Sequence, residues 1–338
     1  MSVDPGREVA SGRVRWYALL SLLLLAATMA EFLTGSTPIL RVAADPVGFL
    51  FLVGMYGGGA LLIREAAIRW GKRWGTVLLL GGAYAVGEEG FDAKTMIDPT
   101  SPIIGNQLFT HYLGVNWVPL AALTLFHAAF SITVPLVLLE LLFPETKGRS
   151  LVGNRGLVLT MVTYGFVTAF LVPFGDPYVP SMWVYLFLAA YALAFVAAAF
   201  LAPKEFLRAK LEAPDRSGRR FVLLGLGFLA NFFLVDTVGI HLLPWQLTAA
   251  LFVPLAAMTA LYLVEHAGRS GNEIVKVSFV LGMLLVFVPI DVLVELGGDV
   301  GVLAYTALIL VLVLGIRRRI VRRGQGSVLA EGRSVSVN

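Results

Sequence analysis

The sequence contains no cysteine and few charged residues. The absence of cysteine from all 338 residues excludes disulfides, thiolate metal sites and cysteine nucleophiles. Charged residues make up only 14% of the chain, whereas a soluble domain carries about 25%. Hydrophobic residues make up 58% of the chain. A chain of this composition cannot hide its apolar surface in a water-soluble core, so its solvent must be lipid.

Several motifs of soluble enzymes are also missing. The sequence has no nucleotide-binding glycine loop, no haem-attachment motif and no nucleophile elbow. It therefore predicts no cofactor and no nucleic-acid partner. The expected partners are membrane lipids, together with a small polar or cationic solute or a membrane-embedded substrate.

Long apolar runs predict an all-α, polytopic bundle of about ten membrane spans, since a span needs about 20 mostly apolar residues. The start of the chain is similar to a signal peptide, with Arg13 and Arg15 before an apolar run. We interpret it as a retained first span because many more spans follow. The candidate spans are 16–35, 46–69, 75–91, 116–143, 155–174, 180–202, 220–238, 246–265, 274–296 and 299–316.

Basic residues predict the orientation of these spans. If both termini are cytoplasmic, nearly all of the 26 lysines and arginines fall on the cytoplasmic side. The six tryptophans fall at or near span ends, as amphipathic rings do at headgroup level. The sequence thus predicts a multi-pass protein of the cell membrane whose basic residues set topology.

The polar linker 203–219 divides the predicted bundle. Spans 1 to 6 form an N-terminal bundle within 1–202 that carries the polar site, and spans 7 to 10 form a C-terminal bundle within 220–323. Residues 324–338 are predicted to be a disordered tail. The last two spans are joined by the glycine pair 297–298, which predicts a hairpin.

Carboxylates near the predicted outer ends of the spans are the candidate functional residues. Glu31 ends the first span, Glu88 and Glu89 end the third, and Asp291 lies in the ninth. Charged side chains at bilayer depth are costly and usually mark a function, although some simply reach headgroup water. Adjacent carboxylates point about 100° apart on a helix, so one of the two glutamates should face the bundle.

His127 is the expected partner of these glutamates. It lies near the middle of the fourth span, which should run antiparallel beside the third. The alternative is that this histidine only hydrogen-bonds a neighbouring helix. We expect Glu31, Glu88, Glu89, His127 and Asp291 to line one solute- or proton-binding cavity.

A second polar group lies in the inner half of the membrane. Arg64 and Glu65 are neighbours in the second span, and Glu140 ends the fourth. Because adjacent helical residues do not face each other, the sequence predicts a structural ion pair between Arg64 and Glu140.

Two resemblances follow from these motifs. The runs YGGGALLIREAAIRW, GGAYAVGEEG and FHAAFSITVP resemble an uncharacterised family of prokaryotic polytopic membrane proteins over about residues 31–145. That resemblance implies no known activity.

Glu88, Glu89 and His127 are also similar in type and separation to motifs of the CAAX protease and bacteriocin-processing family. That resemblance implies that a Glu and a His activate water for peptide hydrolysis within the membrane. The family motifs are EExxxR, FxxxH and HxxxN. Here Ala93 stands at the Arg position and Leu123 at the Phe position, and no HxxxN follows. The resemblance therefore covers the water-activating pair but supplies no residue to stabilise an oxyanion.

Three functions remain open from the sequence. The first is a proton- or cation-coupled secondary transporter, in which Glu88, Glu89 and Asp291 bind the proton or solute. The second is a membrane-embedded hydrolase with Glu88, Glu89 and His127 as its catalytic residues. Two carboxylates and a histidine could also hold a metal, but no HExxH spacing is present, so metal binding stays open. The third is a non-catalytic membrane component.

Overall fold

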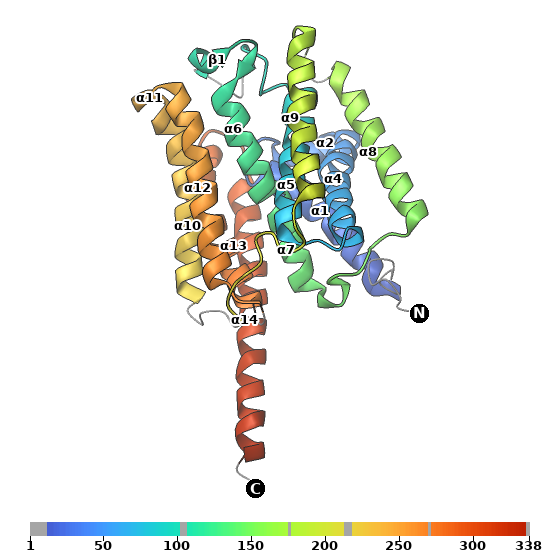
Figure 1. Cartoon of the computed structure of the whole chain (residues 1–338), viewed down its shortest axis with the longest axis vertical. Coiled ribbons are helices and arrows are strands. Elements are labelled where there is room, and N and C mark those ends of the chain that lie inside the picture. The colour runs from blue at the N-terminus through green and yellow to red at the C-terminus, as the bar shows by residue number, and fades with distance from the viewer. Residues whose placement is uncertain (1–11, 102–106, 175–176, 213–217, 270–271, 336–338) are drawn as a thin grey trace.

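The chain is almost entirely helical, with one two-stranded sheet, in a computed structural model that describes residues 12–101, 107–174, 177–212, 218–269 and 272–335. The long helices run side by side along one direction (Figure 1). Within the described residues, seven helical segments are long and apolar enough to cross a membrane. They are Gly12–Phe32, Pro46–Arg69, Trp117–Leu142, Met182–Leu201, Gly218–Leu242, Trp245–His266 and Glu273–Leu296.

Apolar side chains cover the outside of the bundle. On α8 (Asn154–Phe174) Leu159 and Phe166 are exposed, and on α9 (Met182–Leu201) Leu186 and Phe200 are exposed. Exposed apolar surface on this scale marks contact with lipid. The chain is therefore an integral, multi-pass membrane protein. The count of ten spans and the side on which the termini lie remain predictions.

The N-terminal half contributes several helices that are interrupted by π-helical turns. It begins with α1 (Gly12–Phe32), and then α2 (Ile39–Ala44) leads into a continuous run. That run is α3 (Pro46–Leu52), the π-helical η2 (Val53–Gly57) and α4 (Gly58–Arg69). The next is α5 (Trp74–Ala85), which continues as the π-helical η3 (Val86–Asp92).

The segment after η3 forms a small cap. The 3₁₀ turn η5 (Gln107–Thr110) precedes strands β1 (His111–Tyr112) and β2 (Val115–Asn116), which pair antiparallel. The following span consists of α6 (Trp117–Phe126), the π-helical η6 (His127–Ile132) and α7 (Thr133–Leu142). Pro135 lacks an N–H to bond the carbonyl four residues earlier, which explains why the helix departs from α geometry just before it.

The C-terminal half contributes the remaining helices. After α8 and α9 come α10 (Gly218–Leu234), the π-helical η8 (Val235–Gly239), α11 (Ile240–Leu242) and α12 (Trp245–His266). The last two helices are α13 (Glu273–Leu296) and α14 (Val302–Val335). They form the predicted hairpin, in which Gly298 adopts a φ of +106°.

Close packing of α10 against α13 relies on two glycines. A Cβ on Gly225 would lie 2.0 Å from the Phe279 carbonyl oxygen, and one on Gly282 would lie 2.0 Å from the Val222 carbonyl oxygen. Neither position can accept a side chain without moving the helices apart. Glycine thus sets the distance between these two backbones, as is common between membrane helices.

The C-terminal segment differs from the prediction. The helix α14 continues to Val335, so residues 324–335 are helical where the sequence predicts a disordered tail. No proline follows Val302 to stop the helix. In Figure 1, α14 extends well beyond the bundle, and α1 begins toward the same end.

Candidate functional site

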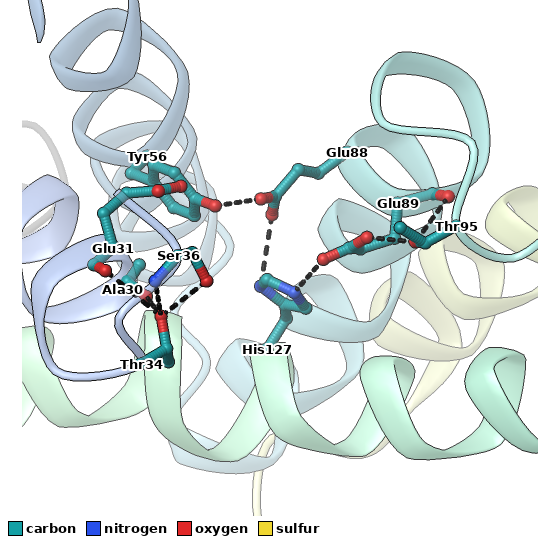
Figure 2. Close-up of polar contacts among 9 residues, drawn as sticks. All are labelled: Ala30, Glu31, Thr34, Ser36, Tyr56, Glu88, Glu89, Thr95 and His127. Carbon is teal, nitrogen blue, oxygen red and sulfur yellow. Dashed lines mark hydrogen bonds and ion pairs between the residues drawn. The ribbon is translucent and has the colours of Figure 1, made fainter. Parts of the chain in front are cut away.

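Three π-helical turns from three different helical runs meet at one place. Tyr56 comes from η2, Glu88 and Glu89 from η3, and His127 from η6. Figure 2 shows these side chains converging from separate helices. π-Helical turns inside longer helices occur frequently at functional sites.

The His127 ring lies between the two carboxylates. Its Nδ1 is 3.1 Å from Glu88 Oε2, and its Nε2 is 2.9 Å from Glu89 Oε1 (Figure 2). Glu88 is 3% exposed and His127 is 4% exposed. The sequence-based prediction that His127 meets this glutamate pair across adjacent helices is confirmed, and both glutamates contact it.

A close approach of backbones makes this meeting possible. A Cβ on Gly81 of α5 would lie only 2.8 Å from the Cα of Ala128, the residue after His127. The absence of a side chain at Gly81 therefore lets α5 pack directly on η6. This contact fixes the start of η3, and so the glutamates, relative to the histidine.

Hydroxyl groups hold the outer oxygens of the glutamates. Tyr56 donates a hydrogen bond to Glu88 Oε1, and Thr95 donates to Glu89 Oε2. The Tyr56 ring also stacks beside the His127 ring, with centroids 6.5 Å apart. Each carboxylate thus has one oxygen directed at a hydroxyl and the other at the histidine.

The segment after η3 closes over the site. Met96 and Ile97 are fully buried, and Asn116 donates hydrogen bonds of 2.8 Å to the carbonyls of Thr95 and Asp98. This network fixes the segment whose Thr95 hydroxyl reaches Glu89. The cap therefore shields the glutamates rather than leaving them open to solvent.

Glu31 forms a third acidic neighbour. It is buried, and Thr37 donates a hydrogen bond of 2.5 Å to its Oε2. Glu31 lies close enough to Glu88 and His127 to interact with both electrostatically. Three of the predicted outer carboxylates therefore gather around one histidine.

The charges of the group formed by Glu31, Glu88, Glu89 and His127 do not sum to zero. A neutral imidazole has one N–H and can donate to only one of its two carboxylate neighbours. If His127 is protonated and all three glutamates are ionised, the group still carries a net negative charge. The ion pairs seen at these residues, in the part of the chain that the structure describes, are those of His127 with Glu88 and with Glu89. A buried excess of negative charge needs a proton or a cation.

The same three side chains form a possible metal-ligand set. One atom each from Glu88, Glu89 and His127 lies within 4.8 Å of the others. Glu88 Oε2 and His127 Nδ1 are buried and have no hydrogen-bond partner, although they lie 3.1 Å apart. The Tyr84 hydroxyl, whose ring centroid is 6.2 Å from that of His127, is also buried without a partner.

Asp291 does not join this group. Thr306 of α14 donates a hydrogen bond to Asp291, and none of the contacts among described residues connects Asp291 to the glutamates or His127. Its place in a shared cavity therefore stays a prediction. The Thr306 hydroxyl bonds one oxygen of this carboxylate, and the other, Oδ1, is buried without a hydrogen bond. Periodicity along one helix could not reveal Thr306 as a partner.

The predicted ion pair between Arg64 and Glu140 also differs. Arg64 approaches Glu65 at 3.3 Å, and Glu140 pairs with Lys276 of α13 at 2.8 Å. Arg64 also donates to the carbonyls of Thr146 and Arg149. A long guanidinium with five donors can bond a neighbouring carboxylate and a folded-back loop at once, so helical spacing did not determine its partner.

Several residues of the site were not predicted from the sequence. These are Tyr56, Tyr84 and Thr95, and Asp92, which is buried with neither carboxylate oxygen hydrogen-bonded. Tyrosines within an apolar span are the one usable signal, because a buried hydroxyl normally seeks a partner. The sequence could not show that two of them point at Glu88 and His127.

The arrangement can accept, hold and pass a proton or a small cation. Its oxygens and imidazole nitrogen are acceptors, and the surrounding donors are hydroxyls. Lys94, one residue after the position of the protease arginine, donates to the Tyr178 carbonyl at 2.9 Å. Comparison with protein-family models, curated proteins and solved structures finds no match to this chain, so its own geometry is the basis for assigning a role.

Proposed function

We propose that this integral membrane protein is a proton- or cation-coupled secondary transporter. Its coupling site is the group formed by Glu88, Glu89 and His127, with Glu31 beside it. The observation that supports this proposal is the buried His127 ring with a carboxylate at each nitrogen, 3.1 and 2.9 Å away. The substrate is a small polar or cationic solute.

The charge of the site favours coupling to a cation. Ionisable groups buried at bilayer depth are expensive and commonly form proton relays in transporters. Binding one proton or cation removes the excess negative charge and so stabilises the closed arrangement. A site whose stability depends on occupancy can link cation binding to a conformational change.

The helix interruptions favour the same role. In secondary transporters, irregular stretches within spans form the substrate and ion sites. Here η2 and η6 interrupt two spans, and η3 ends the α5 run, at the level of the glutamates and His127. We further propose that the protein lies in the cell membrane with both termini cytoplasmic, consistent with α1 beginning toward the end of the bundle where α14 extends (Figure 1).

Flux into proteoliposomes tests the proposal. Purified protein is reconstituted with a pH-sensitive dye inside, and a panel of small cationic and polar solutes is added with and without an imposed pH gradient. We expect at least one solute to drive proton movement, and Glu89→Gln to abolish it. The matched control is Asp236→Asn, because Asp236 also lies in a π-helical turn, η8, but outside the site.

Two results would contradict the proposed transport function. One is uptake that ignores both the pH gradient and Glu89→Gln. The other is an absence of flux for every solute while Glu89→Gln lowers only thermal stability, which would favour a non-catalytic membrane component.

A membrane-embedded hydrolase is the second candidate. The 2.9 Å contact between Glu89 Oε1 and His127 Nε2 favours it, because a paired Glu and His can activate water. Turnover of a membrane peptide that is lost in His127→Ala, with substrate binding retained, would support this reading. The cap formed by the segment after η3 would then have to open to admit water and substrate.

A further inference from the structure

We infer that Glu88, Glu89 and His127 are the ligands of a divalent first-row transition-metal ion. This inference deepens the proposed function by naming the class of cation, and it depends on that function only for what the ion does after it binds. Binding itself follows from the geometry of the three side chains.

The spacing of the ligand atoms suits such an ion. Around an ion with bonds of about 2.0–2.2 Å, neighbouring ligand atoms lie about 3.0–3.5 Å apart. Glu88 Oε2 and His127 Nδ1 lie at this spacing, 3.1 Å apart, whereas Glu89 Oε1 lies 2.9 Å from the other ring nitrogen, Nε2. One atom from each of the three residues lies within 4.8 Å of the others, so Glu89 joins an ion bound by Glu88 and Nδ1 by changing its side-chain rotamer.

Two buried atoms that make no hydrogen bond point to a ligand independently of the acidic character. Glu88 Oε2 and His127 Nδ1 face each other at 3.1 Å, yet both are buried without a hydrogen-bond partner. Figure 2 shows both side chains directed into the same space. A buried acceptor left unpaired is costly, and an ion bound by both atoms removes that cost.

The surrounding hydroxyls act as supports for the ligands. Tyr56 donates to Glu88 and Thr95 donates to Glu89, each to the oxygen that does not face His127. Ligating carboxylates in metal sites are usually oriented by such hydrogen bonds. The hydroxyls therefore leave one oxygen of each glutamate available to the ion.

The donor types select the metal. One imidazole and two carboxylates suit ions such as Mn²⁺, Fe²⁺, Co²⁺ and Zn²⁺. Ca²⁺ and Mg²⁺ prefer oxygen ligands only, and the absence of cysteine excludes thiolate selection of softer ions. Two carboxylates and a neutral imidazole also balance the charge of a divalent ion, and three protein ligands leave a coordination position for water or solute.

Manganese binding tests this inference. The full-length protein is purified in detergent, stripped with EDTA, passed into chelator-free buffer and titrated with Mn²⁺, and free Mn²⁺ is counted by its electron paramagnetic resonance signal. We expect one ion per chain, displaced by Zn²⁺, with nitrogen modulation in the spin echo from a coordinated imidazole. Both the bound ion and the modulation should be lost in His127→Gln, whereas Asp236→Asn should keep them.

A ligand variant that fails to fold would not decide the question, so Tyr56→Phe is the second test. This change keeps all three ligands and removes only a support of Glu88. We expect an affinity for Mn²⁺ about 10- to 100-fold weaker with unchanged stoichiometry. Unchanged affinity in Tyr56→Phe, or bound Mn²⁺ without nitrogen modulation, would overturn the inference.

The outcomes separate this inference from the proposed function. Stoichiometric Mn²⁺ binding without any solute or proton flux would support the metal site and contradict the proposed transport function. Proton-coupled flux that persists in the EDTA-stripped protein, together with an absence of Mn²⁺ binding, would support the transport function and contradict the metal site.

Discussion

His127, which lies between the two glutamates, should contribute more to the free energy of unfolding than the size of its side chain suggests. In His127→Leu, Glu88 and Glu89 lose the group that faces both of them, at 3.1 and 2.9 Å. Removing one partner of a buried ion pair costs about 3–5 kcal/mol, because the remaining charge is left uncompensated. We therefore expect His127→Leu to lower the free energy of unfolding by about that amount.

Neutralising the glutamates in the same chain should restore most of this loss. In the triple variant Glu88→Gln, Glu89→Gln and His127→Leu, the amide oxygens can still accept from Tyr56 and Thr95. Replacement of a whole buried ion pair by neutral groups is often close to neutral for stability. The triple variant should thus be more stable than His127→Leu alone, although it carries two more substitutions.

Thermal unfolding in detergent, followed by the fluorescence of the six tryptophans, measures both effects. The unfolding temperature should fall by several degrees in His127→Leu, and most of the loss should be recovered in the triple variant. If His127→Leu unfolds like Asp236→Asn, or if the triple variant is the least stable of all, then the charges of this group are not coupled and our reasoning fails.

Further predictions concern the framework of the site. Gly81→Leu should cost about 1–3 kcal/mol and weaken Mn²⁺ binding, because a Cβ there meets the Ala128 Cα at 2.8 Å; thermal unfolding and the Mn²⁺ titration check this. Arg64→Met should release the loop after α7, whose carbonyls accept from Arg64, and limited trypsin digestion should then cleave faster after Lys147. Asp291→Asn should leave proton flux unchanged, because Thr306 rather than the site holds that carboxylate; loss of flux would return Asp291 to the site.

Composition and hydropathy are enough to predict the membrane class and the helical fold. The apolar runs fall on helices in the structure because lipid requires every backbone polar group to be bonded within the segment. The meeting of Glu88 and Glu89 with His127 was also predictable, since consecutive spans run antiparallel and are usually neighbours in space. That prediction needed only the depth of each residue in its span.

Contacts between distant elements were not predictable in the same way. The partner of Asp291 comes from the next helix, and Tyr56 reaches Glu88 from a different span. The π-helical turns rotate all later side chains on a helix relative to α-helical spacing, so helical periodicity gives the wrong face beyond them. Arg64 was assigned to Glu140 by that spacing, whereas its length allowed it to bond Glu65 and a loop instead.

The central claim is that a buried, negatively charged group at Glu88, Glu89 and His127 takes up a cation from solution. Charge displacement on a solid-supported membrane measures this uptake directly, with the protein in liposomes exposed to a rapid jump in pH or in Mn²⁺ concentration. We predict a transient inward current that saturates with concentration, is absent in Glu88→Gln with Glu89→Gln, and persists in Asp236→Asn. A current of equal size in the doubly neutralised variant and the unchanged protein would contradict the account.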